Sequence, residues 1–345
     1  MSDAAHFRAA LSFADGVTGF IDVAPEETLL DAAVRQGLQL PSDCREGVCG
    51  TCQGQCESGS YTLAYVDDET LSPAELTAGR VLSCQTLLHS DAAFSFDFAS
   101  TLCASALERT HAVRVTAMER VSPGAALIRL AVAGGQALDF LPGQYARLRV
   151  PHTGETRAYS FVNAPGADTV ELLVRLLPDG AMSDYVRERC TVGDELTLSA
   201  PHGSFYLRDI VRPTIFAAGG TGISAFLAML ARMARADSLP APVHLFYGVN
   251  ESDDLCLRER LDGYARTMPG FTWTPVLARP DAGWPGASGL VTDHLDIDTL
   301  RGAPFDIYVC GPPGMVDALR ERLDAAGLEH YRFFHEKFLP SGLPA

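Results

Sequence analysis

Four cysteines are spaced so that they could hold iron together. The first three are separated by four and then two residues, and the fourth lies far downstream; they are Cys44, Cys49, Cys52 and Cys84. A C-x4-C-x2-C segment with one distant cysteine is a ligand pattern of a [2Fe–2S] cluster. Gly47 and Gly50 lie in the same segment, and glycine permits the tight turns that aim backbone N–H groups at sulfur. The segment therefore predicts a cluster-binding loop.

Other interpretations of these cysteines stay open. A structural zinc site usually has two C-x2-C pairs, and this region has one, so zinc is disfavoured. Cys56 is a rival fourth ligand, and Cys84 is preferred because the last ligand of this spacing lies far from the others. The nine cysteines are an odd number, and no signal peptide is recognised, so we expect a reducing, cytoplasmic location without disulfides.

Length and charge restrict the classes of protein. A chain of 345 residues with 47% hydrophobic and 20% charged residues predicts two or three globular domains. No apolar run is long enough for a membrane span. Residues 1–104 hold 15 acidic residues against 4 arginines, a net charge of −11, whereas the rest hold 28 acids against 23 bases, a net −5. An acidic first part disfavours nucleic acid and suits a basic protein partner, although solubility alone is an alternative reason.

The chain falls into three parts by its pattern of elements. In the first part, strands at 7–13 and 19–23 flank an Asp-Gly turn, and a helix over 28–37 has Thr28 as its cap and Gly37 past its end. This is a small α+β unit, and residues 102–109 are the expected linker. The second part predicts an antiparallel barrel with one helix near 182–188; its strands are expected at 111–120, 126–131, 145–150, 170–175 and 195–199.

The third part alternates apolar strands with helices, which predicts a parallel sheet. Its first strand runs into a glycine turn and then a helix over 224–236, and such a turn lets backbone approach a pyrophosphate at a helix N-terminus. The turn consists of Gly219, Gly220, Thr221 and Gly222, and further strands are expected at 243–247, 272–277 and 305–309.

Two motifs on the barrel could hold a nucleotide. Arg157, Tyr159 and Ser160 end a strand and offer a guanidinium for phosphate and an aromatic ring with a hydroxyl for a flat heterocycle. The second motif opens a predicted helix, where backbone N–H groups and a serine hydroxyl could bind a pyrophosphate. Its residues are Gly180, Met182 and Ser183.

The two barrel motifs resemble the FAD domain of the ferredoxin–NADP reductase superfamily, and the Cys310-Gly311-Pro312 motif strengthens the resemblance. The resemblance implies that Cys310 lies beside the nicotinamide carbon that gives up hydride. It also implies that Phe338 covers the flavin ring and that Glu336 orients the nicotinamide. Glu251 follows the strand at 243–247, where a carboxylate suits a free ribose 2′-hydroxyl, so we expect NADH rather than NADPH.

The order of the three parts most resembles the reductase components of benzoate-type ring-hydroxylating dioxygenases. The resemblance implies a β-grasp [2Fe–2S] ferredoxin domain over 1–102, an antiparallel FAD-binding β-barrel over 107–209 and a Rossmann-like NAD-binding domain over 212–345. Asn163 and its neighbour Val162 depart from the small residues expected after the flavin serine, and Ala225 departs from the expected proline.

The implied function is an NADH-dependent reductase. Hydride passes from NADH to FAD beside Ser160, Cys310, Glu336 and Phe338, and single electrons leave through the [2Fe–2S] cluster to a terminal oxygenase. A Rieske-type oxygenase is preferred over a di-iron one, and neither nucleic acid nor membrane is an expected partner. Two alternatives remain: the reductase of a soluble di-iron monooxygenase of the phenol or methane type, and a zinc-stapled binding module with no enzymatic activity.

Overall fold

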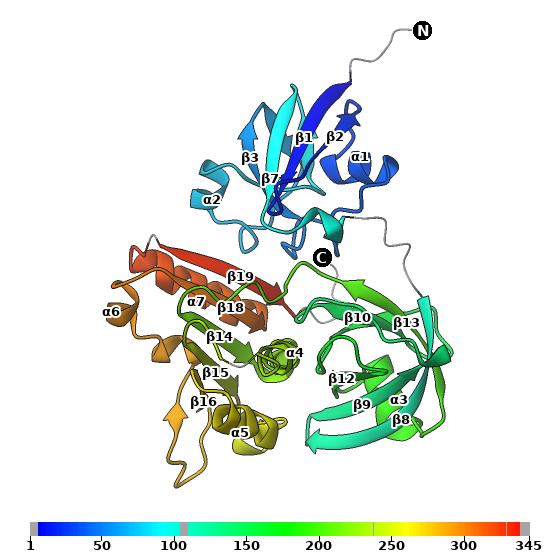
Figure 1. The fold of residues 1–345 in the computed structure, drawn as a ribbon, viewed down its shortest axis with the longest axis vertical. Helices are drawn as coiled ribbons and strands as arrows, with labels where there is room; N and C mark the ends of the chain where they lie inside the picture. The colour runs from blue at the N-terminus through cyan, green and yellow to red at the C-terminus, as the bar shows by residue number, and fades with distance from the viewer. Residues whose placement is uncertain (1–5, 104–109, 237, 329, 339–345) are drawn as a thin grey trace. The chain divides into compact units, whose positions relative to one another are not determined.

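The computed structural model describes residues 6–103, 110–236, 238–328 and 330–338. These residues form two compact units, one ending at Cys103 and the other running from Thr110 to Phe338 (Figure 1). The first unit contains the four cysteines of the predicted cluster loop. No helix among the described residues is long and apolar enough to cross a membrane.

The first unit is a β-grasp fold, as expected. Its five-stranded sheet has the order β2-β1-β7-β3-β5, with β1 parallel to β7 and antiparallel to β2. A second, two-stranded sheet joins β4 and β6. The elements are β1 Phe7–Phe13, β2 Thr18–Val23, α1 Leu29–Arg35, β3 Gln53–Ser58, β4 Tyr61–Leu63, α2 Pro73–Thr77, β5 Arg80–Leu82, β6 Thr86–Leu88 and β7 Ala92–Phe96.

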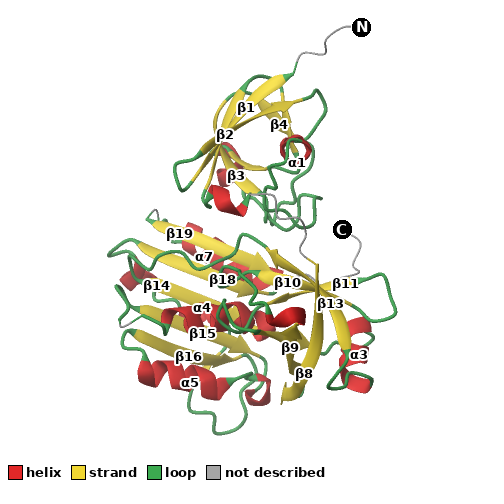
Figure 2. Ribbon diagram, turned by 45° about the vertical axis from the view of Figure 1, so that its right-hand side comes forward, coloured by secondary structure: helices red, strands yellow, loops and turns green. Residues whose placement is uncertain are grey.

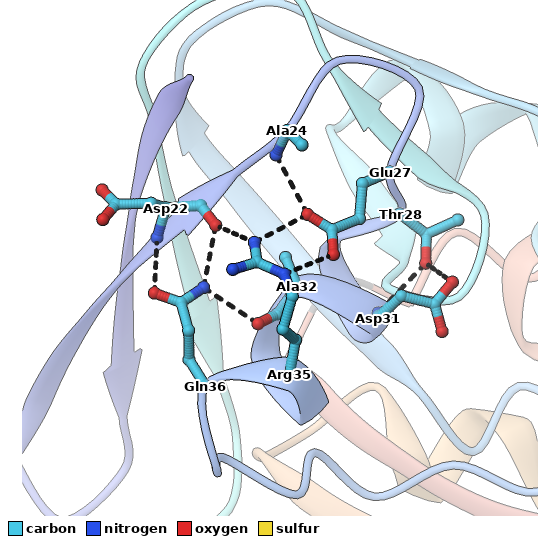
Figure 3. A network of polar contacts seen from close by, with 8 residues as sticks. All are labelled: Asp22, Ala24, Glu27, Thr28, Asp31, Ala32, Arg35 and Gln36. Atoms are coloured by element: carbon cyan, nitrogen blue, oxygen red, sulfur yellow. Dashed lines mark hydrogen bonds and ion pairs between the residues drawn. The ribbon is translucent and has the colours of Figure 1, made fainter. Parts of the chain in front are cut away.

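Helix α1 is fixed at both ends by its own sequence. Thr28 is the N-cap, and its hydroxyl accepts a hydrogen bond at 3.1 Å from the N–H group three residues on. Beyond the helix, Gly37 has a φ of +82°, as the sequence predicts. Arg35 donates to both carboxylate oxygens of Glu27 and to the carbonyl of Asp22 on β2 (Figure 3). These bonds hold the helix against the sheet.

The expected linker is only partly described. Cys103 is fully buried, and its carbonyl accepts a hydrogen bond at 3.1 Å from the N–H group of Gln39. The chain as far as Cys103 therefore packs within the first unit, and is not linker as the sequence suggested. The remaining linker residues, 104–109, lie outside the described residues.

The second unit begins with an antiparallel barrel, which we call the barrel lobe. Its strand order is β11-β10-β13-β8-β9-β12, and a bridge between Phe161 and Leu172 joins the two outer strands. Both the expected barrel and its single helix are confirmed. The elements are β8 Thr110–Ser122, β9 Ala125–Val132, β10 Tyr145–Arg149, β11 Thr156–Ser160, β12 Thr169–Arg175, α3 Ala181–Glu188 and β13 Glu195–His202.

The rest of the second unit, which we call the NAD lobe after the cofactor that the sequence predicts, is a six-stranded parallel sheet in the order β17-β16-β15-β14-β18-β19. Helices cover both of its faces (Figure 2): α4 and α5 pack in one apolar cluster, α6 and α7 in another. The last strand was not anticipated from the sequence. The elements are β14 Thr214–Gly219, α4 Ile223–Met233, β15 Val243–Val249, α5 Arg258–Thr267, β16 Phe271–Leu277, β17 Ala287–Ser288, α6 Ile297–Leu300, β18 Phe305–Gly311, α7 Pro313–Ala325 and β19 Tyr331–Lys337.

One apolar cluster joins the barrel lobe to the NAD lobe. Leu127 on β9 and Leu173 on β12 belong to the same buried cluster as Ile223 and Phe226 at the start of α4. Burial of this apolar surface stabilises the contact between the lobes. The two lobes therefore form one folded unit around a shared core.

Candidate functional site

The four cysteines are arranged as two pairs. The sulfurs of Cys52 and Cys84 are 3.3 Å apart, and the thiol of Cys49 donates a hydrogen bond to Cys44. Within the described part of the chain, no three His, Cys, Asp or Glu side chains surround a common point. Two pairs of thiols are the donor set for two irons that each take two protein sulfurs. The donors therefore fit a [2Fe–2S] cluster.

Hydrogen bonds favour the thiolate form of one cysteine in each pair. A bond from Cys49 lowers the pKa of Cys44 to about 5, and the N–H group of Glu46 also approaches that sulfur at 3.4 Å. A bond from Cys52 lowers the pKa of Cys84 to about 7, with help from the side chain of Gln85. The same bonds raise the pKa of the donors Cys49 and Cys52, so in each pair one sulfur ionises readily and iron must displace the proton of the other.

The rival ligand Cys56 is directed elsewhere. Its thiol donates to the carbonyl of Ser58 at 3.4 Å, within strand β3. Cys84, in contrast, lies against a cysteine of the loop. The structure thus places the sulfur of Cys84, and not that of Cys56, against Cys52 of the loop.

The loop glycines have the backbone conformations that the cluster loop needs. Gly47 and Gly50 have φ values of +83° and +74°, which favour glycine. The N–H group of Gly47 also donates to Cys84. A Cβ atom at Gly47 would lie 2.7 Å from the carbonyl oxygen of Tyr65. The turn is therefore both left-handed and closely packed.

We expect Gly47→Ala to weaken cluster binding. The new methyl group meets backbone at 2.7 Å, and the positive φ is unfavourable for alanine, so the N–H group must move away from Cys84. The purified variant should hold clearly less iron per FAD than the wild type. Gly19→Ala in the same unit is the matched control, because a Cβ atom there meets nothing within 4 Å. Equal iron-to-FAD ratios in the two variants would contradict this role for Gly47.

A second group of predicted residues meets where the barrel lobe joins the NAD lobe. Ser160 ends β11, and its hydroxyl donates to a carboxylate oxygen of Glu336 at 3.4 Å. Cys310 on β18 pairs in register with Glu336 on β19. The N–H group of Phe338 donates to the carbonyl of Gly311 at 2.9 Å. The structure therefore brings all four predicted catalytic residues to one place, at the carboxyl ends of parallel strands, where open α/β sheets bind ligands.

The thiol of Cys310 is held in its neutral form. Its side chain is fully buried, and burial together with the nearby charge of Glu336 raises its pKa well above the ordinary value. Cys310 is therefore suited to packing against an apolar ring edge, and not to nucleophilic chemistry.

The glycine turn packs directly on the Cys310-Gly311-Pro312 turn. A Cβ atom at Gly222 would lie 2.2 Å from the carbonyl oxygen of Cys310, and one at Gly219 would lie 2.8 Å from Pro312. The hydroxyl of Ser224 caps the carbonyl of Thr221 at 2.9 Å, and Gly220 has a φ of +53°. Helices α4 and α7 begin at these two turns, and a helix N-terminus is a place where a pyrophosphate can bind.

The predicted phosphate-binding serine of the barrel needs a correction. The hydroxyl of Ser183 is buried; it donates to the carbonyl of Arg175 at 3.1 Å and accepts from the N–H group of Leu177 at 3.0 Å. Met182 is also buried, in the barrel core. Their side chains thus hold the start of α3 in place, and a phosphate would meet backbone N–H groups beyond Gly180.

The other barrel motif lies on β11 as expected. Arg157 forms an ion pair with Glu155, the residue before the strand, and donates to the carbonyl of Thr156. Tyr159 packs against the barrel core, and burial raises the pKa of its hydroxyl. Arg157 and Tyr159 are two residues apart on β11, so the guanidinium and the aromatic ring lie on the same face of the strand, and Ser160 on the opposite one.

Two ion pairs near the site were missed by the sequence reasoning. Glu251 pairs at 3.2 Å with Arg279, which follows β16, so a cation from a neighbouring loop lies against the predicted ribose-binding acid. The side chain of Lys337, the only lysine of the chain, is 3% exposed and pairs with Asp317 of α7 at 2.8 Å. The Lys337 pair anchors β19 between Glu336 and Phe338. The only indication of this pair in the sequence is that the single lysine lies between two predicted site residues, Glu336 and Phe338.

Three family models match the chain in the expected order. The 2Fe-2S iron-sulfur cluster binding domain matches residues 12–89, the oxidoreductase FAD-binding domain residues 112–206 and the oxidoreductase NAD-binding domain residues 216–321. The chain thus contains domains for all three expected cofactors.

Proteins of similar sequence and structure cover nearly the whole chain. The anthranilate 1,2-dioxygenase electron transfer component of Acinetobacter baylyi is 49% identical over 96% of this chain and 97% of its own length. The 2-halobenzoate 1,2-dioxygenase electron transfer component of Burkholderia cepacia is 42% identical over 96% and 98%. The crystal structure of a cytochrome P450 reductase from Amycolatopsis covers 96% of this chain and 99% of its own at 29% identity, with a TM-score of 0.70.

Proposed function

This chain belongs to the electron transfer components of aromatic-ring dioxygenases, and we propose that it carries electrons from NADH to the terminal oxygenase of such a system. The observation that carries the proposal is the meeting of Ser160, Cys310 and Glu336 in a chain that contains 2Fe-2S, FAD and NAD domains. Bound FAD would supply the conversion of one hydride into two single electrons.

The proposed cofactor ligands follow the arrangement of the side chains. The cluster would be held by Cys44, Cys49, Cys52 and Cys84. FAD would be held by Arg157, Tyr159 and Ser160 and by the backbone at Gly180, Met182 and Ser183, with Phe338 over its ring. NADH would be held by Gly219, Gly220, Thr221, Gly222, Gly311, Pro312 and Glu251, with Cys310 beside the nicotinamide.

The protein's own contribution at the hydride site is orientation and exclusion of water. Glu336 can accept a hydrogen bond from the nicotinamide amide while Ser160 donates to the flavin. Phe338 would cover the flavin and exclude water from it while no nicotinamide is bound. The neutral thiol of Cys310 offers an apolar contact that introduces no competing charge.

We further propose that the partner is a Rieske-type oxygenase. The dioxygenase components are 40–49% identical to this chain, whereas the reductase of the propane 2-monooxygenase from Rhodococcus jostii is 31% identical. The acidic first unit suits a basic docking surface on either partner. Reconstitution with a Rieske dioxygenase and, separately, with a di-iron monooxygenase distinguishes the two; turnover with the di-iron enzyme alone would reject the Rieske proposal.

The visible spectrum tests the proposed function. A flavin–iron protein is yellow-brown, and NADH should bleach both its flavin bands and its broad thiolate-to-iron absorption under argon. A zinc-stapled binding module would be colourless. A coloured protein that NADH does not bleach would also contradict the proposal.

We expect at least a ten-fold higher kcat/KM for NADH than for NADPH, or about 1.4 kcal/mol. Glu251 lies at the proposed ribose site and forms an ion pair with Arg279. A 2′-phosphate would therefore be repelled by the carboxylate and would find the arginine already paired. Glu251→Gln removes the charge that pairs with Arg279, so Arg279 can bind a 2′-phosphate. The kcat/KM for NADPH should then rise, and the ratio of kcat/KM for NADH to that for NADPH should fall. Glu259→Gln, at an exposed position of α5, is the control. A wild type that prefers NADPH would contradict this assignment.

A further inference from the structure

The outer face of β12 points at the NAD lobe. Val170, Leu172 and Val174 belong to the barrel core, so strand alternation places Glu171 and Leu173 on the opposite face. Leu173 packs in the apolar cluster that joins the two lobes. Glu171 lies beside it, with a side chain that is 13% exposed. A carboxylate therefore sits at the edge of an apolar contact between the lobes.

Arginines from both lobes bind this carboxylate. Arg129 stands directly opposite on β9 and donates Nε to Oε1 of Glu171 at 2.8 Å. Arg260, on α5 of the NAD lobe, donates Nη1 to Oε2 at 2.6 Å and Nη2 to Oε1 at 3.1 Å. Although burial acts to raise it, these hydrogen bonds hold the pKa of Glu171 below its ordinary value. The carboxylate is thus ionised, and Arg260 binds it through a bidentate contact across the boundary between the lobes.

The backbone of Glu171 is tied to the flavin-binding strand. Its carbonyl accepts a hydrogen bond at 2.9 Å from the N–H group of Val162, two residues after Ser160. Its own N–H group donates to Asn163 at 2.8 Å. Asn163 departs from the small residue expected there, and this bond gives the departure a structural reason. A displacement of Glu171 would therefore be transmitted to Ser160.

The other end of the contact is tied to the nicotinamide site. Helix α5 is held against the sheet by a hydrogen bond of 3.1 Å from the indole of Trp273 on β16 to Asp262. Strands β16, β15, β14 and β18 are neighbours in one parallel sheet, and β18 carries Cys310. Arg260 is thus one link in a continuous path of hydrogen-bonded elements. The path runs from Ser160, at the flavin site, to Cys310, at the nicotinamide site.

We propose that Glu171, through Arg260, fixes the angle at which the nicotinamide site meets the flavin site, and is a positioning residue for hydride transfer. The inference rests on the proposed function. Apolar contacts are non-directional and would allow the lobes to slide, whereas a bidentate arginine–carboxylate contact is directional. A buried ion pair adds little net stability compared with apolar packing, so its main effect is on geometry. Hydride transfer is sensitive to displacements of an ångström.

The test compares Glu171→Gln with the wild type in NADH–ferricyanide turnover. We expect kcat to fall about ten-fold while KM for NADH changes less than about two-fold, because binding is retained and alignment is lost. The deuterium isotope effect on kcat, with NADH labelled at the transferred hydrogen, should rise. Glu195→Gln is the matched control, since Glu195 pairs with Arg114 within the barrel lobe, on an exposed surface.

Two further outcomes decide the proposal. A Glu171→Gln enzyme with full FAD content and a wild-type kcat and isotope effect overturns it, as does a loss of activity that only follows loss of FAD. If Glu171→Gln does not fold, Arg260→Lys is the second variant, because lysine keeps the charge but cannot form the bidentate contact. An unchanged isotope effect in Arg260→Lys would also overturn the proposal. The wild-type rate with NADH and ferricyanide tests the proposed function separately.

Discussion

Cys84→Ser should abolish NADH-dependent reduction of cytochrome c and leave NADH-dependent reduction of ferricyanide close to the wild-type rate. Cys84 is 5% exposed and lies 3.3 Å from the sulfur of Cys52, so its loss leaves one iron with a single protein sulfur in place of two. Cytochrome c would receive electrons from the cluster, whereas ferricyanide can take them from the flavin. We expect a loss of at least a hundred-fold with cytochrome c, equivalent to about 2.7 kcal/mol of barrier.

The matched control is Cys56→Ser, which removes a thiol from the same unit. The Cys56 thiol contacts only Ser58 among the hydrogen bonds described for it, on its own strand. This variant should keep its iron, its iron-to-sulfur absorption and both activities. If cytochrome c reduction survives in Cys84→Ser and fails in Cys56→Ser, the rival ligand is the correct one. Survival in both would contradict the proposed electron path.

The sequence predicts those parts of the fold that depend on local patterns. The cap at Thr28, the glycine turn at 219–222 and the strand at 170–175 each need only neighbouring residues, and all three are found as expected. The order of the cofactor domains likewise follows from short motifs with characteristic spacing. Local chemistry is therefore a sufficient guide to these elements, whereas it does not indicate the last strand, β19.

Contacts between distant residues were not predictable in this way. Arg260 and Glu171 are 89 positions apart, and the sequence has no periodicity that connects them. The sequence predicts that the Ser183 hydroxyl binds phosphate because it lies at the start of a helix, yet this hydroxyl bonds to the backbone of Arg175 and Leu177. Such choices depend on three-dimensional packing, which decides whether a polar atom faces a ligand or the protein.

Gly222→Ala should remove most NADH-dependent activity while FAD and the cluster stay bound. A Cβ atom at this position would lie 2.2 Å from the carbonyl oxygen of Cys310, a backbone atom that cannot turn aside as a flexible side chain can. The turn carrying Cys310 must therefore move relative to Ser160. A displacement near 1 Å costs about a hundred-fold in rate, so we expect kcat/KM for NADH to fall by about that factor, with both the hydride step and binding affected.

The control is Gly263→Ala in helix α5, where a Cβ atom meets nothing within 4 Å. Alanine there should raise the stability by roughly 0.5–1 kcal/mol and leave the kinetics unchanged. Dithionite, which needs no nucleotide site, should reduce the FAD and cluster of Gly222→Ala as fully as those of the wild type. A Gly222→Ala enzyme with wild-type kcat/KM would show that the two turns are not held together during catalysis. In that case the nicotinamide site must re-form around a shifted Cys310, and the close packing of Gly222 would serve only folding.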